Sequence, residues 1–185
     1  MNEPLNTIFT RSSCRDFKSE ALSSEDLQLI ARAGLAAPSA MNVQPWHISM
    51  ITAPEVLSAL EAEALKNLQQ ANPAAYERLI GRGGTMFYHA PAIAIVWVNE
   101  SYKPGAELLD CGIVTQNIAL AAQSLDIASC ICGLADFAFA GDKAAEFMAK
   151  CRAPEGFRFG MSVLLGRANS AKVPHDIDET KLTFV

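Results

Sequence analysis

The chain has 185 residues, of which 50% are hydrophobic and 19% are charged. A chain of this length suits one domain with a substantial core, and we expect a single domain over residues 1–185. The net charge of −5 argues against a nucleic-acid partner, because nucleic-acid binders normally carry a basic surface. No apolar run has the character of a signal peptide or a membrane span, which predicts a cytoplasmic protein without a membrane partner.

Five cysteines occur at irregular spacing: Cys14, Cys111, Cys130, Cys132 and Cys151. An odd number without a regular pattern argues against a disulfide framework. The sequence has no C-x-x-C and its three histidines lie far apart, so no metal site is predicted. We expect reduced and mostly buried thiols. A Cys–His nucleophile pair is the alternative, and no neighbouring residue favours it.

The first predicted helix begins after Ser23. Ser23 and Asp26 resemble a capping box, and apolar residues then repeat at helical spacing. This helix should end before Pro38, because the residue before a proline is driven out of the helical conformation. A strand is predicted next, over Trp46–Ile51.

A second helix is predicted after Thr52, which resembles a capping-box partner of Glu55. This helix should end near Asn72-Pro73. The pattern of segment 74–89 is unclear, and Arg82-Gly83-Gly84 within it indicates a loop.

A continuous apolar run over residues 92–98 predicts a central strand that is buried on both faces. The remaining predicted elements are a long helix over 107–125, strands over 127–132 and 157–165, and an amphipathic helix over 142–151. Together these elements indicate the α+β class.

The helix over 107–125 is apolar on nearly every side, with almost no charge between Asp110 and Asp126. Such a helix is buried all round, and in so short a chain a second subunit is the simplest cover. The tail over 167–185 is polar but ends in the β-forming residues 182–185. We expect this end to pack on the partner.

Arg11 to Phe17 is the first segment that indicates a binding site. Two arginines four residues apart, with two hydroxyls between them, form a compact set of donors for an anion. The alternative is that these arginines are only solvated, as surface arginines near a chain end usually are.

Ala37 to Trp46 is the second such segment. Two prolines fix its backbone, and Ser39, Asn42 and Gln44 supply neutral donors and acceptors. A rigid polar loop of this kind suits the edge of a planar heterocycle. The alternative is an ordinary connection from helix to strand, which also uses Asn and Pro.

Taken together, the two segments resemble the amino-terminal signature of the FMN-dependent nitroreductase family. The resemblance continues through residues 87–91, through Asp110 and residues 115–125, and through residues 129–133, so it covers almost the full chain. The family implies its own nitroreductase-like fold, in which helices flank a central, mostly antiparallel sheet and two chains form an intertwined homodimer.

The resemblance also implies which residues contact FMN. Arg11, Ser13 and Lys172 would hold the phosphate. Arg15 would lie toward the pyrimidine edge of the flavin, where a cation stabilises the charge that builds at N1 and O2 on reduction. Pro38, Ser39 and Asn42 would come from the other subunit, and residues 131–133 would present backbone to the ring. The full set of implied cofactor residues is Arg11, Ser12, Ser13, Arg15, Pro38, Ser39, Asn42, Ile131, Cys132, Gly133 and Lys172.

The chain departs from the family's pattern in three ways. Ser12 stands where the family often has a second arginine, which leaves more of the phosphate charge to Arg11 and Lys172. Residues 125–131 lack the aromatic residue of the usual Gly-Leu-Gly-Ser-Cys-Trp, so that wall of the pocket differs. The chain is also short for the family, so a substrate carried over by analogy has little weight.

The implied reaction is a ping-pong transfer in which tightly bound FMN takes a hydride from NADH or NADPH at N5. A small, flat electron acceptor such as a nitroaromatic or a quinone then takes it up. No catalytic side chain is predicted, because the flavin carries the chemistry. The alternatives are another redox task such as dehydrogenation or dehalogenation, a flavin-binding dimer without turnover, and a dimer that has lost its cofactor.

Overall fold

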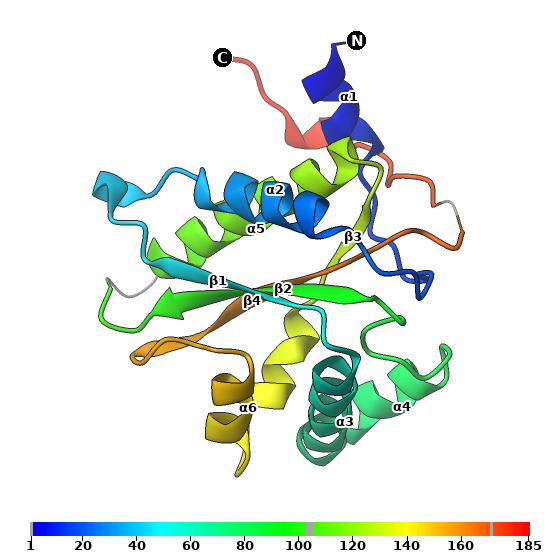
Figure 1. The fold of residues 1–185 in the computed structure, drawn as a ribbon. Coiled ribbons are helices and arrows are strands. Elements are labelled where there is room, and N and C mark those ends of the chain that lie inside the picture. Colours follow the sequence, from blue (N-terminus) through cyan, green and yellow to red (C-terminus); the bar gives the residue numbers. More distant parts are fainter. Residues whose placement is uncertain (1, 103–105, 171) are drawn as a thin grey trace.

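An antiparallel sheet separates two layers of helices (Figure 1). The computed structural model describes residues 2–102, 106–170 and 172–185. Within them the strands are β1 (Trp46–Ile51), β2 (Ala92–Asn99), β3 (Ala128–Ile131) and β4 (Phe157–Gly166). Their order in the sheet is β1-β2-β4-β3, and every neighbouring pair is antiparallel. The predicted α+β class and antiparallel sheet are therefore confirmed.

The helices divide between the two faces of the sheet (Figure 1). One face is covered by α2 (Ser24–Leu35) and α5 (Ala106–Ser124), and α1 (Glu3–Thr10) lies against α5. The other face is covered by α3 (Pro54–Ala71), α4 (Pro73–Ile80), η2 (Gly133–Phe139) and α6 (Ala144–Lys150). The short 3-10 helices η1 (Ala40–Asn42) and η3 (Glu179–Lys181) lie before β1 and in the tail.

The predicted central strand is β2, and both of its faces are buried. All residues from 92 to 98 are buried. Because strand side chains alternate, Ala94 and Val96 join the core under α5, whereas Ile95 and Trp97 join the core on the opposite face. The sheet therefore has a separate apolar core on each side.

The start and end of α2 agree with the prediction. The Ser23 hydroxyl oxygen accepts the backbone N–H of Asp26 at 3.0 Å and caps the helix. The helix ends at Leu35, before Pro38. A serine cap of this kind is typically worth about 1 kcal/mol.

The predicted capping box at Thr52 is wrong. The residue that caps α3 is Ala53, which makes no side-chain bond, and Pro54 occupies the first helical position. Proline begins a helix well because its φ is preset and its missing N–H needs no partner there. The predicted end near Asn72 is correct, but Asn72 also begins α4, where its side chain accepts the N–H of Ala75 at 3.0 Å.

Other boundaries move by one or two residues, and two helices were not predicted. β3 covers 128–131 rather than 127–132, and α6 begins at Ala144 rather than Asp142. α1 and α4 are each eight residues long, too short for a clear periodic pattern.

Helix α5 is covered on one side only. Its inner side packs on the sheet and α2 through residues such as Val114 and Ile118, which are fully buried. Its outer side exposes Leu108 and Leu109, at 52% and 70%. One chain therefore leaves part of this apolar helix in water, and the partner that we predicted for it remains a prediction.

Candidate functional site

Residues 11–18, which we call the cationic segment, are fixed between β3 and the beginning of the tail. Ser13 pairs with Ser129 in a parallel bridge, and the N–H of Cys14 donates to the Ser129 carbonyl at 2.9 Å. On the other side, the N–H of Lys18 donates to the Arg167 carbonyl at 2.9 Å. The segment thus lies beside the sheet like a short additional strand.

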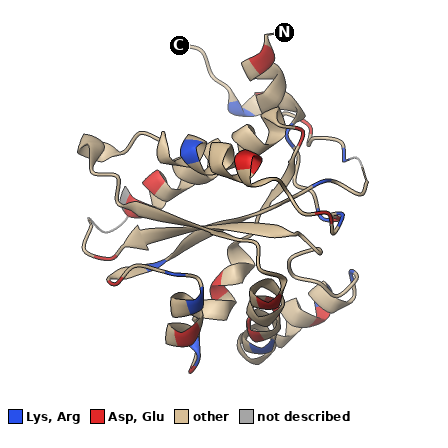
Figure 2. Ribbon diagram, in the orientation of Figure 1, with Lys and Arg blue, Asp and Glu red and all other residues tan. Residues whose placement is uncertain are grey.

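Three cationic residues of the predicted site, Arg11, Arg15 and Lys172, lie near one another at the cationic segment. The Ser12 hydroxyl donates to the carbonyl of Lys172 at 3.2 Å, which joins the tail to the cationic segment. Burial raises the pKa of the Cys130 thiol, while the nearby charges of Arg15, Lys172 and Arg11 act in the opposite direction. Figure 2 shows both basic and acidic positions on the side where these segments lie.

Arg11 has a buried donor that no described residue satisfies. Its Nη1 atom is buried and has no hydrogen-bond partner among the residues that the structure describes. A buried charged donor without an acceptor is costly, so this atom suits an anion such as a phosphate. Arg11 also lines a cavity of about 620 Å³ between α1, α5 and the tail, together with Ile8, Phe9, Gln116, Pro174, His175 and Ile177.

The end of β3 offers backbone rather than side chains. Cys132 is buried, its N–H donates to the Ser162 carbonyl at 2.9 Å, and its carbonyl accepts the Ser162 hydroxyl at 2.6 Å. Because ladder bonds alternate in an antiparallel pair, the N–H and C=O of Ile131 face the opposite edge of β3, where Ser13 lies. Gly133 is exposed, and a β-carbon there would meet only Met161. Ile131 and Gly133 therefore present the accessible backbone.

Residues 38–44, which we call the proline loop, are held by bonds within the loop. The Ser39 hydroxyl accepts the N–H of Gln44 at 2.8 Å, and the Asn42 side-chain oxygen accepts the Gln44 amide at 2.9 Å. Met41, Asn42 and Gln44 have φ values of 52°, 55° and 51°. Left-handed residues other than glycine store strain, which persists where the surroundings impose it, often at functional sites.

The predicted site residues form two groups within one chain. Arg11, Ser12, Ser13, Arg15, Lys172 and residues 131–133 gather around the cationic segment. Pro38, Ser39 and Asn42 lie in the proline loop, at the opposite end of the molecule (Figure 1). One chain does not bring the two groups together.

Comparisons with known proteins settle the family. The sequence model of the nitroreductase family matches residues 8–166. The chain belongs to the nitroreductase family. Its fold is that of a nitroreductase from Desulfitobacterium hafniense solved with bound FMN, which is 46% identical at a TM-score of 0.96, over 100% of this chain and 99% of that one.

Two further relatives of this nitroreductase-family chain extend the comparison. A nitroreductase from Bacteroides fragilis, also solved with bound FMN, is 26% identical over 100% of both chains, with a TM-score of 0.90. A protein of Archaeoglobus fulgidus with the provisional name "NADH dehydrogenase/NAD(P)H nitroreductase" is 33% identical over 132 residues. That match covers 70% of this chain and 66% of the relative, somewhat less than two thirds of its length.

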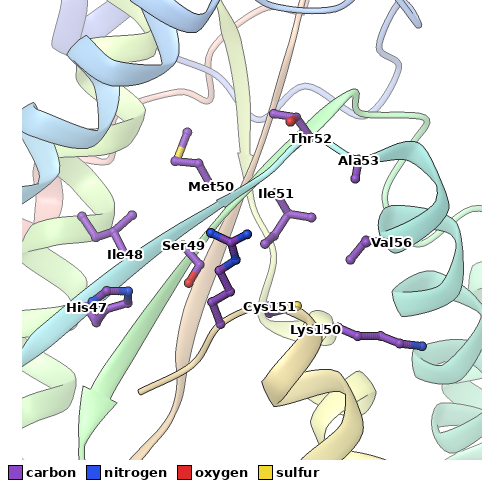
Figure 3. A pocket seen from close by; sticks show the side chains of 11 residues that line it. His47, Ile48, Ser49, Met50, Ile51, Thr52, Ala53, Val56, Lys150 and Cys151 are labelled. Atoms are coloured by element: carbon purple, nitrogen blue, oxygen red, sulfur yellow. The ribbon is translucent and has the colours of Figure 1, made fainter. Parts of the chain in front are cut away.

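The nitroreductase-family chain has a second hollow, away from the predicted residues. A groove of about 510 Å³ follows the open edge of β1 and is bounded by α3 and the end of α6 (Figure 3). Its lining consists of residues 47–53, Val56 and residues 150–152. None of these residues was predicted to contact the cofactor. An edge strand has unpaired backbone groups along such a groove, so the groove suits a peptide strand.

The described part of the chain contains neither a candidate metal site nor a candidate membrane-spanning helix. Within it, no group of His, Cys, Asp and Glu side chains has the arrangement that a metal ion needs. No helix found there is long and apolar enough to cross a membrane.

Tyr88 is a residue of the site region that the sequence did not single out. Its carbonyl accepts the N–H of Phe17 at 3.2 Å, and its side chain lies near Arg15, Cys130 and Cys132. Residues 87–91 entered the sequence analysis only as part of the family resemblance, and the fold reveals that Tyr88 lies beside the cationic segment.

Proposed function

We propose that this chain is an FMN-dependent oxidoreductase that uses NADH or NADPH to reduce flat, electron-poor acceptors such as nitroaromatics or quinones. The observation that carries this proposal is the buried donor of Arg11, which no described residue satisfies and which lies with Arg15 and Lys172 near accessible backbone at the end of β3. Membership of the family supports it, as do relatives at 46% and 26% identity that were solved with bound FMN.

The cationic segment would bind the phosphate and orient the ring. Arg11 would place its free Nη1 on a phosphate oxygen, and Lys172 would add a second charge from the tail. Ser12 and Ser13 are half-buried and supply hydroxyls beside them. Arg15 is exposed and would extend toward the pyrimidine edge of the flavin. Ile131 and Gly133 would form the backbone floor, and Cys132 would fix that floor through Ser162.

Bound FMN supplies the atom that accepts a hydride from the nicotinamide and later delivers it to the acceptor, so the chain needs no acid–base pair of its own. The residues of the chain would hold the ring in place. In the ping-pong order that we propose, the oxidised nicotinamide would leave before the acceptor binds at the same site.

We infer that a second copy of the chain completes the site. The proline loop lies far from the cationic segment of its own chain, so its Ser39 and Asn42 can contact the flavin only in another subunit. The outer side of α5, with Leu108 and Leu109 exposed, supplies an apolar surface for that contact. Covering about 1,600 Å² in total is typical of a stable interface of this kind.

The groove on β1 would receive the end of the partner's tail. Because the N–H of Asn99 donates to the Pro45 carbonyl, the alternation of ladder bonds leaves Ile48 and Met50 with backbone groups on the open edge. Residues 182–185 are exposed and β-forming, and Phe184 is 89% exposed. Lys150 and Arg152 line the groove and suit the terminal carboxylate.

An anaerobic titration with NADH and NADPH, followed at the flavin absorption band, tests the proposed function. We expect the purified protein to be yellow, or to become yellow with added FMN, and to be bleached by a nicotinamide. A nitroaromatic or a quinone should restore the colour. A colourless protein that takes up no FMN contradicts the flavin site, and a yellow protein that neither nicotinamide bleaches contradicts the reductase.

A further inference from the structure

Hydrogen bonds fix the backbone of Tyr88 and of the residue before it. The Tyr88 carbonyl accepts the N–H of Phe17 at 3.2 Å, so Tyr88 is joined to the cationic segment. The preceding N–H, that of Phe87, donates to the Glu61 carboxylate at 2.8 Å. Phe87 itself is buried in the core, at 4% exposure. The position of Tyr88 relative to Arg15 is therefore set by the fold.

The backbone at this position is strained. Tyr88 has a φ of 53° and the following His89 a φ of 63°. Two successive left-handed residues that are not glycine cost on the order of 1–3 kcal/mol each. An ordinary turn needs no tyrosine here, because glycine would adopt the same conformation without strain. The retained strain directs a large side chain to a defined place.

The Tyr88 side chain lies near the cationic segment and the end of β3. Burial raises the pKa of its phenol and so do the neighbouring thiols of Cys130 and Cys132, whereas Arg15 opposes this shift. The hydroxyl therefore keeps its proton at neutral pH. The Arg15 guanidinium lies near this phenol, whose oxygen can accept an N–H and whose O–H can donate.

We propose that Tyr88 is a positioning residue for the flavin, which holds the Arg15 guanidinium at the pyrimidine edge and donates its own O–H to that edge. The proposal rests on the function proposed above and deepens it. A cation and a donor at N1 and O2 favour the reduced flavin, which carries more negative charge there. Tyr88 would thus raise the midpoint potential of bound FMN.

Tyr88→Phe tests the proposal because it removes only the hydroxyl. We expect FMN affinity close to that of the wild type, and a tenfold loss in the equilibrium for reduction of bound FMN. For a two-electron couple that loss is a shift of about 30 mV to more negative potential. Tyr76→Phe is the matched control, because Tyr76 is a half-buried tyrosine on α4, outside the predicted site. Its potential should equal that of the wild type.

The same change made in an Arg15→Gln protein distinguishes a positioning role of Tyr88 from a role in packing alone. If Tyr88 acts through Arg15, then Tyr88→Phe should change the potential much less in an Arg15→Gln protein than in the wild type. Equal shifts in both backgrounds overturn the positioning role, and so does a Tyr88→Phe protein with wild-type potential. Should Tyr88→Ala alone lose FMN while Tyr88→Phe behaves as wild type, the ring is only filling space. A wild-type protein that binds no FMN instead contradicts the proposed function.

Discussion

The cationic segment and the proline loop differ in how each is held. Residues 11–18 are bonded to β3 on one side and to the tail on the other, and they carry a buried donor that has no acceptor among the described residues. Residues 38–44 are bonded mainly to themselves, are mostly exposed and hold left-handed backbone. Each region therefore offers only part of the proposed flavin site. In the dimer that we propose, a two-fold pair of chains would place the loop of one beside the segment of the other.

The largest effect should come from the surface that we propose as the contact between two subunits. Leu109→Glu places a charge on the outer side of α5, where Leu109 is 70% exposed in the single chain. If that side is buried in a dimer, the unpaired charge should weaken association by about 3 kcal/mol or more, roughly 100-fold. Sedimentation should then show a monomer, and bound FMN should fall with it.

Ile80→Glu is the control for that prediction. Ile80 is an exposed apolar residue on α4, in the other helical layer, at 39% exposure. The variant should stay dimeric and yellow. A Leu109→Glu protein that also remains dimeric would mean that α5 is not the interface.

The cationic segment is tested by Arg11→Ala. Removing a charge-assisted contact to the phosphate should weaken FMN binding by about 1.5–3 kcal/mol. Fluorescence titration of the apoprotein measures the affinity, and Arg78→Ala on α4 is the control that removes a charge elsewhere. Unchanged affinity in Arg11→Ala would show that its buried donor does not hold the phosphate.

The tail is tested by removing residues 182–185. The loss of one short strand and its terminal carboxylate from each groove should weaken the dimer by about 1–3 kcal/mol, because about four residues of strand pairing and packing are removed. The folded chain should keep its melting behaviour when monomeric, since these residues are exposed there. An unchanged dimer dissociation constant would show that residues 182–185 do not bind in the β1 groove of the partner.

The proline loop should show the smallest effect. Asn42→Gly removes the amide and suits the left-handed φ of 55°. We expect FMN affinity to fall by about 1 kcal/mol, the value of one neutral hydrogen bond, while the dimer stays intact. Flavin content after gel filtration measures the loss. A variant that retains the full flavin content would exclude the Asn42 side chain from the site.

The sequence predicted the elements with long, regular patterns and missed those whose start depends on geometry. β2 and α5 were predicted because their apolar runs are long, and α2 because Ser23 caps it. The start of α3 was wrong since Thr52 and Pro54 compete for the same turn, and position alone does not show which residue begins the helix.

The sequence predicted which residue types form the candidate site, but not which of them lie next to one another in the fold. Arg11 and Arg15 indicate an anion site by their spacing, but the approach of Lys172 depends on a tail that returns from far along the chain. Cys132 was predicted to present its backbone to the ring, and this backbone is bonded to Ser162, a pairing that only the register of β3 and β4 reveals. Tyr88 was missed because periodicity does not report where a turn directs a side chain.

Mixing two deficient variants tests the shared site most directly. Arg11→Ala and Asn42→Trp, a bulky change in the proline loop, should each bind FMN poorly as homodimers. In a mixed dimer one site carries both changes and the other carries neither, so co-refolding the two should restore roughly a quarter of the sites to wild-type affinity. Arg11→Ala mixed with Lys172→Ala should restore none, since both residues lie on the same side of the site. Failure of the first mixture, while its chains form mixed dimers, would contradict a site built from two subunits.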